Sequence, residues 1–219
     1  MIAGILPRGV AVVEAYDDSV PAPLFPAEEE LVRDAVAKRR SEFSTARRCA
    51  REALAALGYP PRPILTGERG APAWPAGVVG SITHCAGYRT AVVAPAADFR
   101  AIGVDAEPNE ALPEGVLEAI ALPEELDAVA ALRAARPGTH WDRLLFCAKE
   151  AVYKAWFPLT LRWLGFEEAE VRMDPSRGRF EALLRVGAES GGRPLTGFSG
   201  RFVTAGTLMA TAIAVPARS

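Results

Sequence analysis

The clearest pattern of apolar and polar positions in the chain runs over residues 139–158. Apolar side chains recur there at the spacing of one helix face, at Leu144, Leu145, Ala148, Ala151, Val152 and Ala155. Thr139, with Asp142 three residues later, is a plausible helix start of the capping-box kind. Pro158 is expected to end the helix. The pattern therefore predicts a long helix with one buried face.

Shorter apolar runs predict β-strands. A short strand is expected before a turn at Gly87, and a second strand over residues 89–94 completes a hairpin. Residues 101–104 begin another strand-like segment, and residues 206–216 form a run rich in Ala, Thr and Val that resembles the run ending at Pro95. Antiparallel strands packed against separate helices indicate the α+β class.

The predicted long helix and one of the predicted strands carry charges among apolar neighbours. Lys149, Glu150 and Lys154 lie on the helix, and a solvated ion pair between Glu150 and Lys154 is the ordinary explanation for two of them. Asp105 and Glu107 end the strand. Because alternate residues of a strand face the same side, these two carboxylates are expected to project together. An exposed acidic strand end is the ordinary explanation here.

Taken together, Asp105, Glu107 and Glu150 supply three oxygen ligands of the kind that Mg²⁺ prefers, with water and phosphate oxygens completing the shell. Zinc is not expected. The three cysteines are far apart in the sequence and form no C-x-x-C pair, and the chain has only two histidines.

Positive charge is concentrated upstream of these acids. Residues 33–51 carry seven Lys or Arg and two acids, whereas residues 101–132 carry eight acids and no Lys or Arg. A helix is expected over residues 44–57, on which Arg47 and Arg51 share a face. This face could simply be solvated. It could also bind phosphate, because the planar guanidinium group matches phosphate oxygens.

Ser81 and His84 lie near the end of the first hairpin strand. A hydroxyl group and an imidazole ring at such a position can hydrogen-bond a phosphate, and each could equally be a structural residue. The sequence alone leaves both readings open.

Composition restricts the classes of protein. The chain has 219 residues, of which 50% are hydrophobic, and a net charge of −2, so a substantial core is expected and a general nucleic-acid binder is not. Residues 1–7 lack the basic and apolar regions of a signal peptide, and no apolar run is long enough to predict a membrane span. Unpaired cysteines without a secretion signal predict a cytoplasmic protein.

Four stretches of the chain, in this order, resemble the Sfp-type 4′-phosphopantetheinyl transferases, in particular their enterobactin-synthetase and actinobacterial branch. The match covers residues 38–158. Phe146 stands where many relatives have Trp. The stretches are the helix with Arg47-Arg48-Cys49-Ala50-Arg51, the segment Trp74 to Tyr88 with Gly-Ser-Ile-Thr-His-Cys, the strand Gly-Val-Asp-Ala-Glu ending at Glu107, and the Lys-Glu-Ala-x-x-Lys motif starting at Lys149.

The resemblance implies a Mg²⁺-dependent enzyme that moves phosphopantetheine from coenzyme A to a serine of an apo acyl or peptidyl carrier protein and releases 3′,5′-ADP. It implies that Asp105, Glu107 and Glu150 hold Mg²⁺ on the pyrophosphate of coenzyme A and that Glu150, directly or through a water, is the best candidate base for the carrier serine. Lys149 and Lys154 are implied to stabilise charge on the pyrophosphate.

The resemblance also assigns the phosphates of coenzyme A to basic and polar residues of the first half of the chain. These are Arg47, Arg51, Ser81 and His84, with Arg69 as a less specific match. The sequence does not decide which residue contacts which phosphate.

For architecture, the resemblance implies two similar α/β subdomains in a pseudo-twofold arrangement with the active site in the cleft between them. Residues 1–108 would form the subdomain that grips the nucleotide, and residues 109–219 the subdomain with the catalytic helix and the carrier-docking surface. One compact unit, and a monomer, are expected.

Two other functions stay open on the sequence alone. One is a different Mg²⁺-dependent nucleotide or phosphoester enzyme, although no G-x-x-x-x-G-K-[ST] phosphate loop occurs. The other is a non-catalytic module that binds coenzyme A or carrier proteins.

Residues 155–166 are rich in aromatic and aliphatic side chains, and a minority of them, including Leu161 and Arg162, are expected to be exposed for carrier docking.

Overall fold

The computed structural model describes residues 1–217, which form two compact units. The N-terminal unit comprises Pro7–Ile102 together with Pro216 and Ala217, and the C-terminal unit comprises Met1–Leu6 and Gly103–Val215. The units therefore divide inside a strand, before the residue-108 boundary predicted from the sequence, and the strand end that carries Asp105 and Glu107 belongs with the C-terminal unit. The predicted division of functions at residue 108, and the single compact body, stay predictions.

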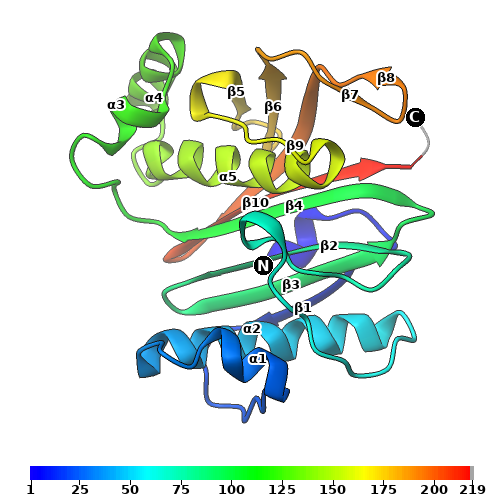
Figure 1. The fold of residues 1–219 in the computed structure, drawn as a ribbon. Helices are drawn as coiled ribbons and strands as arrows, with labels where there is room; N and C mark the ends of the chain where they lie inside the picture. The colour runs from blue at the N-terminus through cyan, green and yellow to red at the C-terminus, as the bar shows by residue number, and fades with distance from the viewer. Residues whose placement is uncertain (218–219) are drawn as a thin grey trace. The chain divides into compact units, whose positions relative to one another are not determined.

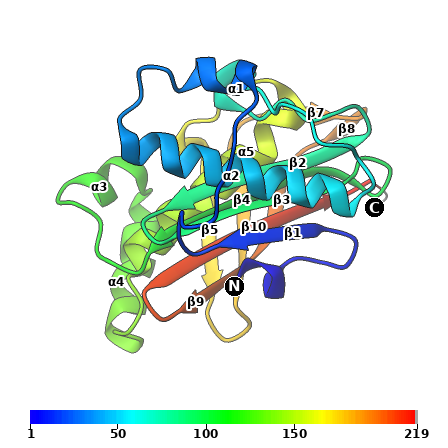
Figure 2. The same ribbon diagram turned by 90° about the horizontal axis from the view of Figure 1, so that it is seen from below.

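The N-terminal unit is a three-stranded antiparallel sheet covered by a long helix. The strand order is β1-β3-β2, and Figure 2 shows α2 running across the sheet. The hairpin predicted around Gly87 is confirmed, with Gly87 in the left-handed region at φ +75°. The elements are β1 (Ala11–Ala15), α1 (Pro26–Leu31), α2 (Ala37–Ala56), η2 (Glu68–Gly70), β2 (Val78–Cys85) and β3 (Tyr88–Pro95).

Helix α2 begins at Ala37, so the predicted start at Ser44 is wrong. Lysine and arginine are good helix formers, and the run from Lys38 to Arg40 extends the helix by more than a turn without a side-chain cap. The apolar face of α2 packs on the sheet through Cys49, Ala50, Ala53 and Leu54, against Ala91 and Val93 of β3. The longer helix brings Arg39 onto its first turn.

The C-terminal unit is a five-stranded sheet of order β4-β10-β9-β6-β5 with helix α5 lying along one face, as Figure 1 shows. Its elements are η1 (Ile2–Ile5), the end of β4 (Phe99–Pro108), α3 (Val116–Ile120), α4 (Pro123–Ala135), α5 (Trp141–Thr160), η3 (Phe166–Glu168), β5 (Ala169–Asp174), β6 (Arg179–Leu184), β7 (Glu189–Ser190), β8 (Arg193–Pro194), β9 (Gly197–Ala205) and β10 (Leu208–Pro216).

Helix α5 is the predicted long helix. The six apolar residues that predicted it are all buried, with exposures of 0 or 1%. The start at Thr139 is wrong, since α5 begins at Trp141 with His140 as an N-cap that makes no side-chain cap bond. Pro158 does not end the helix, because a proline in the last turn removes only one backbone N–H. The helix ends when Leu161 turns into the left-handed region at φ 54°.

These elements confirm the α+β class with antiparallel sheets packed on helices. Within residues 1–217, no helix combines the length and the apolar composition that a membrane crossing requires. The pseudo-twofold arrangement and the location of the active site in a cleft stay predictions.

Candidate active site

Gly103 seats strand β4 directly on helix α5. An ideal Cβ built at this position would lie 2.0 Å from the carbonyl oxygen of Ala151 and 2.6 Å from the backbone nitrogen of Ala155. Only glycine allows this approach between the two backbones. The acidic end of β4 therefore lies beside the segment of α5 that carries Glu150 and Lys154.

Asp105 and Lys154 form an ion pair across this contact. The Lys154 ammonium donates to Asp105 Oδ1 at 2.8 Å and to the Val104 carbonyl at 3.1 Å. Asp105 is 5% exposed. The carboxylate within ion-pair distance of Lys154 is thus that of Asp105, so the solvated Glu150–Lys154 pair considered from the sequence is not formed among the described residues. Burial acts to lower the pKa of Lys154, but Asp105 and Glu150 outweigh it and raise the pKa.

Glu107 and Glu150 both lie in the field of Asp105. Burial, followed by the charge of Asp105, raises the pKa of Glu107 to about 6. The same two causes, in the same order, raise the pKa of Glu150. Asp105 is therefore a common neighbour of the two glutamates, and its negative charge makes the ionisation of Glu107 and Glu150 harder.

This donor set fits Mg²⁺ in its chemistry. Three carboxylates provide hard oxygen ligands, and a shared cation would offset the repulsion that raises the pKa values of Glu107 and Glu150. The side chains are not arranged as a ready-made metal cluster among the residues that the structure describes. Lys154 holds Asp105, and Arg143 holds Glu107 at 3.2 Å.

Arg143 is a site residue that the sequence reasoning missed. Besides Glu107, its guanidinium donates to the backbone carbonyls of Glu110 at 3.2 Å and Ala111 at 2.9 Å. It therefore ties the segment after β4 to α5 and holds the Glu107 side chain. Its position two turns before Glu150 on the same helix was the signal available in the sequence.

Lys149 faces away from these acids. Its ammonium donates to the carbonyls of Phe166 at 2.7 Å and Ala169 at 2.8 Å, and it pairs with Glu125 at 2.8 Å. An ammonium group has three N–H donors, and these three partners occupy all of them. Burial, partly offset by Glu125, lowers the pKa of Lys149. These contacts do not support the predicted contact between Lys149 and the pyrophosphate, which stays a prediction.

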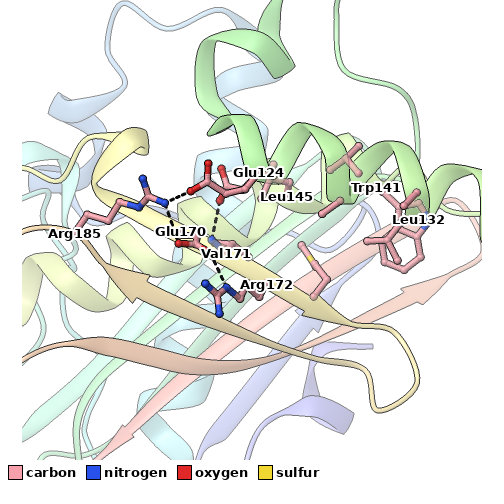
Figure 3. A pocket seen from close by; sticks show the side chains of 13 residues that line it. Glu124, Leu132, Trp141, Leu145, Glu170, Val171, Arg172 and Arg185 are labelled. Carbon is pink, nitrogen blue, oxygen red and sulfur yellow. Dashed lines mark hydrogen bonds and ion pairs between the residues drawn. The ribbon is translucent and has the colours of Figure 1, made fainter.

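A cavity of about 750 Å³ lies on the same side of α5 as Lys149, between α4, α5 and β5 (Figure 3). Apolar side chains such as Leu132, Trp141 and Leu145 line its interior, and ion pairs of Arg185 with Glu124 and Glu170 lie at its edge. None of the residues predicted for the active site lines it. It is distinct from the acidic region at the end of β4.

In the N-terminal unit, Arg51 is committed to a buried carboxylate. Glu28 is 0% exposed and accepts hydrogen bonds from Arg51 at 2.9 Å and from the backbone N–H of Ile64 at 2.9 Å. Arg51 also donates to the Pro23 carbonyl at 2.7 Å and lies over the Phe25 ring. This guanidinium holds the loop before α1 and the buried Glu28, which does not support the predicted phosphate contact of Arg51, and that contact stays a prediction.

Arg47 and His84 fit the predicted phosphate grip better, and Arg39 joins them. Arg39 Nη1 lies 2.5 Å from His84 Nε2. Arg47 donates to Thr66 Oγ1 at 3.3 Å, and its Nε atom is buried with no partner among the described residues. Burial, followed by the charges of Arg39 and Arg51 against that of Glu28, lowers the pKa of Arg47 to about 10. Crowded cations of this kind are stabilised by an anion.

Ser81 and His84 do not point the same way. They are three residues apart on β2, so the alternation of a strand puts their side chains on opposite faces. His84 is on the face that contacts Arg39 of α2, and Ser81 is buried on the other face. Arg69 is exposed, with a left-handed backbone at φ 51° in η2. Phosphate contacts by Ser81 and Arg69 stay predictions.

Comparison with known proteins identifies relatives over nearly the whole chain. Residues 27–94 match the family model of the 4′-phosphopantetheinyl transferase N-terminal domain, and residues 101–190 match that of the 4′-phosphopantetheinyl transferase superfamily. The chain is 54% identical to the 4′-phosphopantetheinyl transferase Svp of Streptomyces mobaraensis, over 99% of this chain and 90% of Svp. It is 51% identical to Npt of Nocardia iowensis (98% and 99%) and 49% identical to PptT of Mycobacterium tuberculosis (97% and 97%), both also named 4′-phosphopantetheinyl transferases.

Proposed function

Because the chain belongs to the 4′-phosphopantetheinyl transferase superfamily, we propose how its own residues carry out the reaction of that family. The chain is a transferase that moves the 4′-phosphopantetheine group from coenzyme A to a carrier protein. The resemblance to the Sfp-type enzymes is confirmed. Mg²⁺ dependence, the residue roles and the details of the partner are part of the proposal.

The observation that carries the proposal is the convergence of Glu107, Glu150 and Lys154 on Asp105, which Gly103 makes geometrically feasible. Asp105, Glu107 and Glu150 would hold Mg²⁺, which when bound neutralises charge on the pyrophosphate of coenzyme A. Phosphoryl-type transfer depends mainly on positioning and charge neutralisation, and the region needs no covalent nucleophile of its own.

Glu150 is the proposed base for the carrier serine. Its carboxylate lies in the same region as Asp105 and Lys154, where it could accept the proton of a bound hydroxyl group. The serine oxygen forms a bond to the phosphorus attached to pantetheine, its proton passes to Glu150, and the bond from that phosphorus to 3′,5′-ADP breaks. Lys154 has two of its three N–H donors on Asp105 and Val104, so the third can donate to the departing phosphate.

For the nucleotide end of coenzyme A, the proposal assigns phosphate binding to Arg39, Arg47 and His84 in the N-terminal unit. The lowered pKa of Arg47 supports this, because neighbouring cations and burial together make a bound anion favourable. Arg51 is not assigned to phosphate binding, because its guanidinium group forms an ion pair with the buried Glu28 carboxylate.

A surface after α5 is the proposed contact for the carrier protein, and it is defined by Leu161, Arg162 and Trp163. The predicted split of residues 155–166 is confirmed: Ala155, Trp156 and Leu164 are buried, whereas Leu161 is 69% and Trp163 is 59% exposed. Arg162 is also exposed, and its guanidinium reaches the Gly187 carbonyl at 2.9 Å. Exposed apolar side chains beside a cation suit a partner with an apolar and acidic surface.

The test is incubation of the chain with coenzyme A and several apo carrier proteins, followed by mass measurement of each carrier. We expect a mass gain of one phosphopantetheine group on a serine, and loss of the gain when EDTA removes divalent metal. A carrier that gains no mass with any substrate, while coenzyme A still binds, would indicate a binding module. Equal turnover with and without EDTA would show that the reaction does not depend on Mg²⁺. Light scattering of the same sample tests the expected monomer.

A further inference from the structure

We propose that Lys149 is a positioning residue, which through its buried pair with Glu125 fixes the rotation of α5 and so aims Glu150. The inference rests on the proposed role of Glu150. It replaces the substrate contact expected of this lysine from its place in the Lys-Glu-Ala-x-x-Lys motif.

The first step concerns the groups that hydrogen-bond to the Glu125 carboxylate. This carboxylate is 2% exposed and takes hydrogen bonds from three elements of the C-terminal unit. Oε1 accepts from the Val171 N–H of β5 at 2.7 Å, and Oε2 accepts from the Leu122 N–H at the start of α4 at 2.7 Å and from Lys149 of α5 at 2.8 Å. Glu125 is therefore a junction between α4, β5 and α5.

The second step concerns Lys149, the other residue of the buried pair. Lys149 donates its remaining two N–H groups to the carbonyls of Phe166, at the start of η3, and Ala169, at the start of β5. Its side chain is 1% exposed. A buried ammonium with three fixed acceptors cannot leave them at small cost, because the charge would lose its partners. Lys149 is thus a rigid anchor on the face of α5 that looks toward α4 and β5.

The third step links the anchor to Glu150. Successive residues of an α-helix are about 100° apart around its axis, so fixing the direction of Lys149 fixes that of Glu150. The contact of Gly103 with Ala151 sets the distance between α5 and β4, and the buried apolar face of α5 and the Lys154–Asp105 pair restrain the rotation of the helix on that side. The Lys149–Glu125 pair adds a restraint on the side of α5 that faces α4 and β5.

The cavity in Figure 3 increases the importance of this restraint. The space between α4, α5 and β5 is not filled by side chains, so fewer packing contacts hold α4 against β5 than in a continuous core. The buried pair, the exposed pair of Arg185 with Glu124 and the half-buried pair of Arg185 with Glu170 lie around this region. The exposed pair between Arg185 and Glu124 holds weakly, so the Lys149–Glu125 pair is the one with both charges buried.

The experiment compares three variants with the parent chain. The paired variant Glu125→Gln/Lys149→Met removes both buried charges, so that neither is left alone. Lys149→Arg keeps the charge but enlarges the head group. Arg133→Met/Asp142→Asn is the matched control, because it removes both charges of another α4–α5 ion pair, that of Arg133 with Asp142 at 2.9 Å, far along the helix from Glu150. Each variant is measured for melting temperature, for coenzyme A affinity by calorimetry, and for kcat and KM in the carrier mass assay.

For the paired variant we expect coenzyme A affinity within about twofold of the parent, an unchanged KM, and a kcat lower by about ten- to a hundred-fold, the scale of a misplacement of roughly 1 Å. Arg133→Met/Asp142→Asn should keep the parent kcat. Coenzyme A affinity at least tenfold weaker in the paired variant would mean that Lys149 touches substrate and would overturn the inference. A folded paired variant with parent kcat would overturn it too, since the pair would then be structural only.

If the paired variant does not fold, the test uses kcat and coenzyme A affinity of Lys149→Arg. A lower kcat with unchanged coenzyme A affinity would support the positioning role. The parent kcat, or a weaker coenzyme A affinity, would overturn it. The parent chain separates this inference from the proposed function. A parent without transfer activity contradicts the proposed function, whereas calorimetry of coenzyme A still tests whether Lys149 contacts the substrate.

Discussion

The Lys154 ammonium lies 2.8 Å from Asp105 Oδ1, which joins helix α5 to the acidic end of strand β4. The pair is mostly buried, with side-chain exposures of 27% and 7%. The charge of Asp105 also acts on two further carboxylates, Glu107 and Glu150. Charged groups arranged in this way can stabilise charge that develops during a reaction.

The first prediction concerns these acids. Asp105→Ala or Glu150→Gln should lower kcat by a factor on the order of 10², the scale for losing a preorganised charged group at a metal-assisted site. Glu110→Gln is the control, because Glu110 is an exposed acid just after β4 and outside the proposed metal-ligand set. The carrier mass assay at limiting Mg²⁺ measures the effect, and parent turnover in either site variant would exclude its residue from the site.

The second prediction concerns the seat of α5 on β4. Gly103→Ala should cost about 3 kcal/mol or more of unfolding free energy, the upper end for overpacking, because the new methyl group would meet a backbone carbonyl that no side-chain rotation can move. Gly138→Ala is the control, since a Cβ there meets no atom within 4 Å. Urea unfolding of both variants provides the measurement. Equal stabilities would contradict the close contact.

Local patterns in the sequence predicted the core face of α5 and the shared face of Asp105 and Glu107. Helical and strand periodicity act over a few residues, so the sequence displays them directly. The hairpin at Gly87 was predictable for the same reason. Helix ends were less predictable, because α2 and α5 both begin without a side-chain cap and Pro158 is tolerated in the last turn.

The roles of individual charged residues could not be predicted in this way. Lys149 and Glu150 are neighbours in one motif, yet the first faces Glu125 of α4 and the second faces Asp105 of β4. Arg51 repeats the point, because its partner Glu28 comes from a different helix and is fully buried. Long-range partners decide whether a basic residue binds substrate or holds the fold, and the sequence pattern does not contain them.

The third prediction concerns pH. The pKa of Glu107 is about 6 in the folded chain against an ordinary value of 4.5, so the folded state binds more protons than the unfolded state between these values. Folded stability should therefore fall as pH rises from about 4.5 to 6, by an amount on the order of 2 kcal/mol, and stay low above pH 6.

Glu107→Gln should remove this dependence. Urea unfolding of parent and variant across pH 4 to 8 in EDTA, with both buffered at equal ionic strength, measures the difference. We expect the variant to gain stability relative to the parent as pH rises, and a constant difference across this range would contradict the assignment.

The fourth prediction separates two arginines on the same helix. Arg47→Met should weaken coenzyme A binding about ten- to a hundred-fold, the loss of a charge-assisted hydrogen bond, and should cost little stability because burial already disfavours its charge. Arg51→Met should instead cost about 3–5 kcal/mol of stability, because it leaves the buried Glu28 unpaired. Calorimetry and urea unfolding of both variants test the contrast, with Arg39→Met expected to behave like Arg47→Met. Dephospho-coenzyme A shows whether the lost contact is to the 3′-phosphate.

The last prediction concerns carrier docking at Leu161. This residue is 69% exposed and has φ 54°, a conformation that costs a side-chain-bearing residue about 1–2 kcal/mol. Leu161→Gly should therefore stabilise the chain by about 1 kcal/mol while removing the apolar side chain from the surface. If the side chain contacts the carrier, Leu161→Gly and Leu161→Asp should both raise the KM for the carrier and leave the coenzyme A affinity unchanged. Arg162→Glu should act in the same direction if the partner surface is acidic. If Leu161→Gly has the same KM for the carrier as the parent chain, the Leu161 side chain does not contact the carrier and serves only to end α5. A loss of stability could not explain that result, because this variant is expected to be more stable than the parent chain.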